Sequence, residues 1–90
     1  KILIGKGIKY YSKLGVAEFL IESQDLTVGD EILITGPTTG AVETTVQEIR
    51  VDLKTVEKAI KGDHISIPIP EKIRPSDKLY KLESAEKTFM

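Results

Sequence analysis

Apolar and polar residues alternate in three separate stretches of this chain. Apolar side chains recur at every second position over residues 17–21, 32–34 and 65–69, beside polar positions such as Glu18 and Ser66. A period of two buries one face of a β-strand and exposes the other. Ile, Val and Thr also occupy 26 of the 90 positions, and such branched side chains suit strands better than helices. The pattern predicts an all-β fold.

Turn residues separate the predicted strands at short intervals. Residues 7–11 and 16–21 predict a hairpin, in which Gly15 supplies the positive φ that the turn needs. The segment from Gly36 to Gly40 predicts a second hairpin loop, after a strand over residues 31–35. The first half of the chain is therefore expected to consist of consecutive hairpins.

The second half adds a longer strand, one helical segment and a final strand. A long strand is expected from Ala41 to Val51, and its alternation slips by one position after Val46, which predicts a β-bulge. Lys54–Lys61 is the one helical candidate, because its apolar residues follow helical spacing and a glycine comes next. Lys78–Leu82 predicts the last strand.

These elements predict one small domain. Six or seven short strands at spacings of about ten residues favour a closed β-barrel, because closure removes unpaired sheet edges. The barrel is expected over residues 1–82, with one short helical turn, and residues 83–90 are expected to form a frayed tail. Pro68 and Pro70 cannot donate ladder hydrogen bonds, so that end of their strand is expected at an edge or at the barrel mouth.

Composition limits the cellular location and the binding partners that can be expected. Thirteen Lys and Arg against 14 Asp and Glu give a net charge of −1, which does not indicate a strongly basic nucleic-acid binder. The sequence contains no cysteine, so disulfides and thiolate metal sites are excluded and a reducing cytoplasm is the expected location. It shows no signal peptide or membrane-spanning stretch, and no membrane partner is expected.

Two Gly-Asp pairs are the clearest local motif. Gly29-Asp30 and Gly62-Asp63 each follow an apolar anchor and precede an alternating strand. Glycine accepts the left-handed turn position, and aspartate accepts hydrogen bonds from nearby backbone N–H groups. We therefore interpret both pairs as structural turns, together with Gly15 and Gly36, rather than as catalytic aspartates.

No set of residues meets the requirements of a catalytic or metal site. His64 and Ser66 share a strand face, but the adjacent Asp63 points to the opposite face, so they do not make a Ser/His/Asp triad. One histidine and scattered carboxylates have no metal-ligand spacing. Residues 36–40 lack the Lys-Ser/Thr of a phosphate-binding loop. We expect no catalytic residue, no metal and no cofactor.

Basic and tyrosine residues gather near the first hairpin and the last strand. Lysines hold phosphates and tyrosines stack on bases, so these residues are candidates for weak contact with RNA or with a partner. The alternative is a solvated surface on a chain that is also rich in acids. The candidates are Lys6, Lys9, Tyr10, Tyr11, Lys13, Lys72, Arg74, Lys78 and Tyr80.

The spacing of the Gly-Asp pairs and of the apolar residues around them resembles domain II of the translation GTPases. The resemblance is carried by Gly15–Ala17, Leu26–Gly36, Val56–Ala59 and Gly62-Asp63, and it covers about residues 5–82. It implies a Greek-key β-barrel. Those factors usually carry Gly-Asp before the last strand, whereas this chain has Ser76-Asp77.

With Ser76-Asp77 at this point, and with the segments Thr35–Gly40 and Glu48–Leu53, the sequence is similar to the C-terminal domain of the collagenase-like peptidase family. That family includes tRNA-hydroxylation proteins. In that family the active part is a separate N-terminal domain and the barrel is an accessory module. The resemblance implies a non-catalytic barrel that positions substrate or docks against an N-terminal catalytic domain of the same polypeptide. The first residue is Lys1, not Met, which is what we expect of a segment cut from a longer protein.

The translation-factor resemblance leaves a second function open. A barrel of that type contacts RNA or a ribosomal partner directly, and the sequence upstream of Lys1 would separate the two possibilities. A phosphate-binding GTPase domain there would favour the translation factor, and a peptidase-like domain would favour the accessory module.

Overall fold

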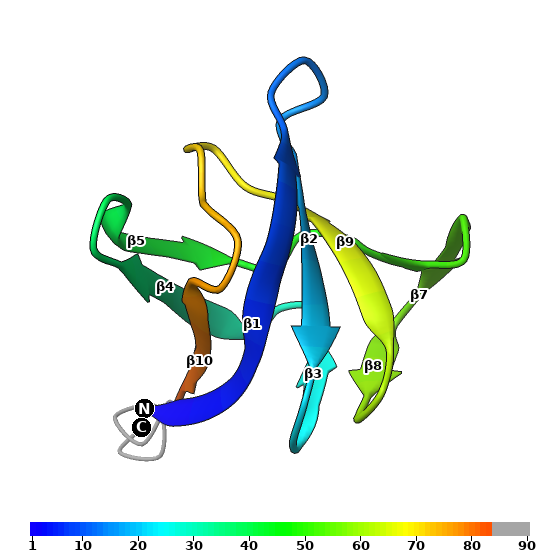
Figure 1. Cartoon of the computed structure of the whole chain (residues 1–90). Helices are drawn as coiled ribbons and strands as arrows, with labels where there is room; N and C mark the ends of the chain where they lie inside the picture. Colours follow the sequence, from blue (N-terminus) through cyan, green and yellow to red (C-terminus); the bar gives the residue numbers. More distant parts are fainter. Residues whose placement is uncertain (84–90) are drawn as a thin grey trace.

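Alternating apolar side chains build the strands of this domain, and the computed structural model describes residues 1–83. Ten strands occur in that part of the chain, and Figure 1 shows them curling around a common interior. In order they are β1 (Ile2–Tyr11), β2 (Val16–Ile21), β3 (Asp25–Thr27), β4 (Glu31–Gly36), β5 (Gly40–Thr45), β6 (Ile49–Val51), β7 (Lys54–Val56), β8 (Lys58–Ile60), β9 (His64–Pro68) and β10 (Lys78–Leu82).

Eight of these strands form one antiparallel sheet in the order β5-β4-β10-β1-β2-β9-β6-β7, and β3 pairs with β8 in a second, small sheet. β10 lies between β4 and β1, and β9 lies between β2 and β6, although these strands are far apart in the sequence. The long connections that bring them there are of Greek-key type. The ladder order is linear, from β5 at one end to β7 at the other. The all-β prediction is confirmed, with ten short strands in place of six or seven.

The core is filled almost entirely by aliphatic side chains from the inward faces of the strands. The predicted alternation is confirmed, because residues 17, 19 and 21 of β2, residues 32 and 34 of β4 and residues 65, 67 and 69 in and after β9 are all buried. Phe19 is the largest fully buried side chain, and the others of this class are Ile4, Ile21, Leu26, Ile32, Ile34, Ile49, Ile65, Ile67, Ile69, Ile73 and Leu79.

The predicted helical turn over Lys54–Lys61 is wrong, because this segment forms β7 and β8. Ala59 is buried whereas Ile60 is exposed, so these neighbours point to opposite faces as strand residues do. Gly62, which was expected to end the helix, lies at φ +96° in a tight turn. Within residues 1–83 no helix occurs that would be long and apolar enough to cross a membrane.

The predicted long strand from Ala41 to Val51 is also wrong, because it consists of β5 and β6, which lie in different parts of the sheet. β5 pairs with β4, and β6 pairs with β7 and β9. Between them, Val46 is buried and exchanges backbone hydrogen bonds with the turn that precedes β4. The slip in alternation therefore marks a change of partner strand rather than a β-bulge.

Three chain reversals share one geometry, and each leads into a core strand. In each, an aspartate carboxylate accepts a hydrogen bond of 2.9 Å from the backbone N–H three residues earlier: Asp30 from Thr27, Asp63 from Ile60 and Asp77 from Arg74. The residue before each aspartate has a positive φ, of +99° at Gly29, +96° at Gly62 and +71° at Ser76. Ser76 therefore adopts the conformation that glycine adopts in the other two turns.

Each of these turns is also fixed to a distant backbone segment by a reciprocal pair of hydrogen bonds. The residue before the aspartate donates its N–H, and the aspartate carbonyl accepts one from the same partner residue. The partners are Val46 for the first turn, Ile21 for the second and Gly7 for the third, with distances of 2.7–2.9 Å. The turns therefore connect strands that are far apart in sequence.

The third turn carries an additional contact through its aspartate. Asp77 is 3% exposed, and its carboxylate accepts hydrogen bonds from the backbone N–H of Arg74 and from the hydroxyl of Thr39. Thr39 belongs to the loop between β4 and β5, and a Cβ on Gly36 would collide with the Asp77 carboxylate. Asp77 thus holds the β4–β5 hairpin against the connection into β10.

The shared turn geometry predicts opposite effects for a reciprocal substitution. Ser76→Gly is expected to raise the free energy of unfolding by about 0.5 to 1 kcal/mol, because relief of the left-handed conformation outweighs the added freedom of the unfolded chain. Gly62→Ser is expected to lower it by about 1 kcal/mol for the same reason. Urea unfolding measures both, and a lower midpoint for Ser76→Gly would show that the serine side chain stabilises the turn.

Candidate binding surfaces

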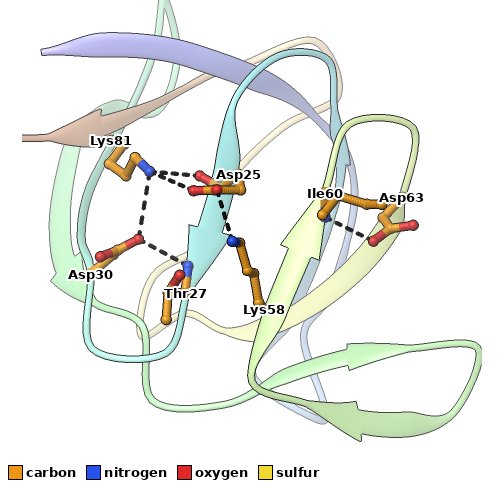
Figure 2. A network of polar contacts seen from close by, with 7 residues as sticks. All are labelled: Asp25, Thr27, Asp30, Lys58, Ile60, Asp63 and Lys81. Carbon is orange, nitrogen blue, oxygen red and sulfur yellow. Dashed lines mark hydrogen bonds and ion pairs between the residues drawn. The ribbon is translucent and has the colours of Figure 1, made fainter.

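The most connected group of charges joins the small sheet to the large one (Figure 2). Lys81 of β10 donates to the backbone carbonyl of Asp25 at 2.8 Å and to its carboxylate at 3.0 Å, and lies 3.9 Å from the carboxylate of Asp30. Lys58 of β8 pairs with the second carboxylate oxygen of Asp25 at 3.3 Å. Strands β3, β8 and β10 and the turn before β4 thus meet at one cluster.

This cluster is structural rather than catalytic. The Lys81 side chain is only 20% exposed, and its ammonium group is used by Asp25 and Asp30. The carboxylate of Asp30 is also used by the turn that it caps. Hydrogen bonds from Lys81 first, and then from Lys58, lower the pKa of Asp25 below its ordinary value. An ionised Asp25 therefore keeps the small sheet attached.

The basic residues predicted from the first hairpin and the last strand come together on neighbouring strands. Lys6 of β1 and Lys78 of β10 are cross-strand partners and both are exposed. Lys6 has Glu22 at 3.9 Å, and Tyr80 lies farther along β10 with the ammonium group of Lys1 over its ring at 4.9 Å. We call Lys1, Lys6, Lys78 and Tyr80 the basic face.

The other candidates of the first hairpin have different surroundings. Tyr10 packs against the core and its hydroxyl donates to the carbonyl of Ile69 at 2.9 Å. Lys9 lies over the ring of Tyr11 at 5.1 Å, and Lys13 is exposed in the hairpin turn. The hydroxyl of Tyr11 donates to Glu18 at 3.2 Å, and this hydrogen bond and the negative charge of Glu18 raise the pKa of Tyr11.

Two candidates lie in the connection between β9 and β10. Arg74 donates to the backbone carbonyl of Lys72 at 3.4 Å, and Lys72 is exposed. The turn that contains Arg74 is held against Gly7 of β1, so it lies beside the strand that carries Lys6. The prediction that these residues contact RNA or a partner stays a prediction.

A groove of about 560 Å³ lies between two hairpins on the outer side of β2 and β9. One wall is the β1–β2 hairpin and the other is the β6–β7 hairpin, whose tips project from the body of the fold in Figure 1. We call this the inter-hairpin groove, and it is lined by Tyr11, Leu14, Val16, Glu18, Glu48, Arg50, Asp52, Leu53, His64, Ser66 and Pro68.

The polar side chains of the groove are arranged around two glutamates. Glu18 accepts the Tyr11 hydroxyl, and His64 approaches its other carboxylate oxygen at 3.9 Å. Glu48 accepts a hydrogen bond from Arg50 at 3.1 Å and one from the hydroxyl of Thr55 at 3.3 Å. This arrangement is suited to binding polar and cationic groups.

The groove does not assemble a nucleophilic triad. His64 and Ser66 share a face as the sequence predicts, but the carboxylate of Asp63 caps its own turn. His64 instead has Glu18 as its acidic neighbour. Among residues 1–83, no three His, Asp or Glu side chains lie close enough together to hold a metal ion.

The sequence prediction included Tyr11 but missed the rest of the groove. Glu18 was noted only as the polar partner in an alternating strand, and His64 and Ser66 were weighed only as part of a triad. Leu14 lies in a predicted turn, and Leu53 lies between the predicted long strand and the predicted helical turn. The signal available from the sequence was Leu14 in a predicted short turn, where small or polar residues are usual. The turn that contains Leu53 was not predicted.

Comparison with known proteins finds homologues named collagenase and protease. The chain is 65% identical over 86 residues to a protein named collagenase from Porphyromonas gingivalis. This alignment covers 96% of this chain and 21% of that protein. It is 40% identical over 83 residues to an uncharacterized protease of Methanocaldococcus jannaschii. This second alignment covers 92% of this chain and 20% of that protein. The chain therefore spans about a fifth of the length of these homologues. No family model matches it.

A solved structure has the same fold. The C-terminal domain of a Geobacillus thermoleovorans protein that carries the name U32 peptidase superimposes with a TM-score of 0.85 at 16% sequence identity. The match covers 90% of this chain and 100% of that one. At this identity the likeness concerns the fold alone.

The Asp25 cluster predicts acid sensitivity. Because the pKa of Asp25 is lower in the folded chain than in the unfolded one, its stabilisation is complete above the unfolded pKa and is lost as pH falls through the folded pKa. Urea midpoints are expected to fall as pH drops below about 4, and Asp25→Asn is expected to make that decline shallower. Asp52→Asn, on the exposed β6–β7 turn, is the control. An unchanged slope for Asp25→Asn would exclude the cluster as the cause.

Proposed function

We propose that this chain is a non-catalytic accessory domain of a longer, peptidase-like polypeptide. The observation that supports this most strongly is the alignment of nearly the whole chain with about a fifth of the length of homologues named collagenase and protease. The fold of a C-terminal domain of a protein named U32 peptidase agrees with it. A catalytic domain N-terminal to this one, in the same polypeptide, is the partner that the proposal implies, and the cysteine-free sequence supports a cytoplasmic location.

Within such a polypeptide, the domain positions substrate or docks against the catalytic domain. It offers an open groove and a basic face, and both are carried by strands whose inward sides form a close-packed core. Rigid strands hold surface side chains at fixed positions, which suits recognition. The bond-breaking step is assigned to the other domain.

The proposal predicts that the domain affects the KM for large substrates. In the longer polypeptide, removing this domain is expected to leave kcat on a short fluorogenic peptide within about twofold. It is expected to raise KM on a long denatured polypeptide by about tenfold, because binding remote from the reacting bond is lost. Steady-state kinetics on both substrates measure the split.

The isolated chain is the control for this experiment, and it is expected to hydrolyse neither substrate. Hydrolysis by the isolated chain would contradict the non-catalytic assignment. Equal loss of kcat on short and long substrates after removal would instead make the domain part of the catalytic unit.

A second candidate function is direct contact with RNA, as in a translation-factor or tRNA-modifying protein. The observation that favours it is the cross-strand pair Lys6 and Lys78, because like charges placed directly opposite each other repel. Glu22, 3.9 Å from Lys6, offsets one of the two charges, and a phosphate group can offset the other. Tyr80 lies on the same strand as Lys78 and offers a ring on which a base could stack.

This alternative predicts salt-dependent binding of single-stranded RNA. Polyuridylate is expected to bind at low salt, and the double variant Lys6→Glu with Lys78→Glu is expected to weaken binding about tenfold or more. Fluorescence anisotropy across a salt series measures both the affinity and its salt slope. The double variant Lys54→Glu with Lys61→Glu makes the same charge change at exposed positions away from the basic face and is the matched control. An absence of binding at low salt would eliminate this candidate.

A further inference from the structure

Each hairpin that walls the inter-hairpin groove exposes a leucine at its tip. Leu14 in the β1–β2 turn is 73% exposed, and Leu53 in the β6–β7 turn is 94% exposed. Both line the groove, and Figure 1 shows that the two tips project away from the core. These leucines contribute little to folding, because neither is withdrawn from water.

Leu53 also has an unfavourable backbone conformation. The β6–β7 turn has two central residues with positive φ, +51° at Asp52 and +67° at Leu53, as a type I′ turn requires. Glycine or asparagine suits such a position, whereas a leucine there costs about 1 kcal/mol or more. A strained leucine that is 94% exposed contributes little to folding, so its position indicates a binding role.

The charge of the groove limits what it can bind. Its lining contains three carboxylates, Glu18, Glu48 and Asp52, and one guanidinium, Arg50, which pairs with Glu48. These four groups carry a net formal charge of −2, so the groove attracts cations and repels phosphates. The Glu18 side chain is 27% exposed and lies on a strand between the two apolar tips, where it can receive a basic side chain.

The groove continues into a neighbouring hollow, which favours an extended occupant. That hollow measures about 650 Å³ and shares Glu48 and Pro68 with the groove. Its other lining residues include Ile69 and Pro70, which follow β9. Two adjoining hollows with common walls form a trough that suits an extended chain better than a compact small molecule.

We propose that the inter-hairpin groove binds an extended stretch of substrate polypeptide, in which a Lys or Arg side chain meets Glu18 and apolar side chains on either side pack against Leu14 and Leu53. The floor is polar, with His64 and Ser66, as in surfaces that bind a partner transiently. A permanent interface with another domain of the same polypeptide would be more apolar. The inference rests on the proposed accessory role and names the surface that performs it.

The test uses two synthetic peptides and the ninety-residue chain. The first contains Leu-Ser-Lys-Ser-Leu between capped glycines, so that Leu, Lys and Leu share one face of an extended chain. The second has Glu in place of Lys. NMR titration is expected to give a Kd of about 0.1 to 1 mM for the Lys peptide, with shifts centred on groove residues, and at least about tenfold weaker binding for the Glu peptide.

Variants separate a binding role from a structural one. Leu53→Gly is expected to weaken binding of the Lys peptide about threefold or more while keeping or raising the urea midpoint, because glycine removes the backbone strain. Glu18→Gln is expected to weaken binding of the Lys peptide about fivefold. Leu3→Ser, at an exposed leucine on β1 outside the groove, is the control and is expected to leave Kd unchanged.

Three results would overturn the inference: no binding of the Lys peptide at millimolar concentration, equal binding of both peptides, or an unchanged Kd for Leu53→Gly. If peptide binding fails but removal of the domain still raises KM for long substrates, the accessory role stands and this groove is not its surface. If peptide binding succeeds and removal changes nothing, the groove binds polypeptides without serving the catalytic domain.

Discussion

A single backbone constraint organises this fold: an aspartate carboxylate accepts a hydrogen bond from the N–H three residues before it, while the residue just before the aspartate adopts a positive φ. The constraint occurs before β4, β9 and β10, and each time the turn is fixed to a strand or crossover distant in sequence. Strands pair correctly only if their register is fixed at an end. Three turns of this kind set the register of three strands, and the aliphatic core fills the space between them. Ser76 shows that the constraint lies in the aspartate and the backbone conformation rather than in glycine itself.

The sequence was sufficient to predict the strands that have one buried and one exposed face. The alternation around Phe19, Ile32 and Ile67 led to the correct faces, and Lys78–Leu82 was predicted with its observed bounds. Two Gly-Asp turns were also visible, because their glycines make them conspicuous. The third turn was noticed only because Ser76-Asp77 stands where the translation factors have Gly-Asp. A serine gives no sequence signal of the positive φ that Ser76 adopts. Local patterns predict an element well when its constraint is local.

The errors arose where a distant partner determines the local structure. Val56, Ala59 and Ile60 have helical spacing, but Ala59 pairs with Leu26 in the small sheet and Ile60 points outward. Val46 leaves the alternation because it bonds to the turn before β4, which no local rule reveals. The groove was missed for the same reason: Leu14 and Leu53 are far apart in sequence and face a common hollow only after β6 has paired with β9. The resemblances to translation-factor barrels and to tRNA-hydroxylation proteins stay predictions.

A net charge of −1 conceals two surfaces of opposite character. The groove between the hairpins has an excess of carboxylates, whereas Lys6 and Lys78 face each other across β1 and β10. Because β2, which forms the floor of the groove, pairs with β1, the two surfaces are only a strand apart. Charge alone would therefore direct phosphate groups to the basic face and basic peptides to the inter-hairpin groove. Average composition argued only against a strongly basic nucleic-acid binder, because it does not show how the fold separates the basic residues from the acidic ones.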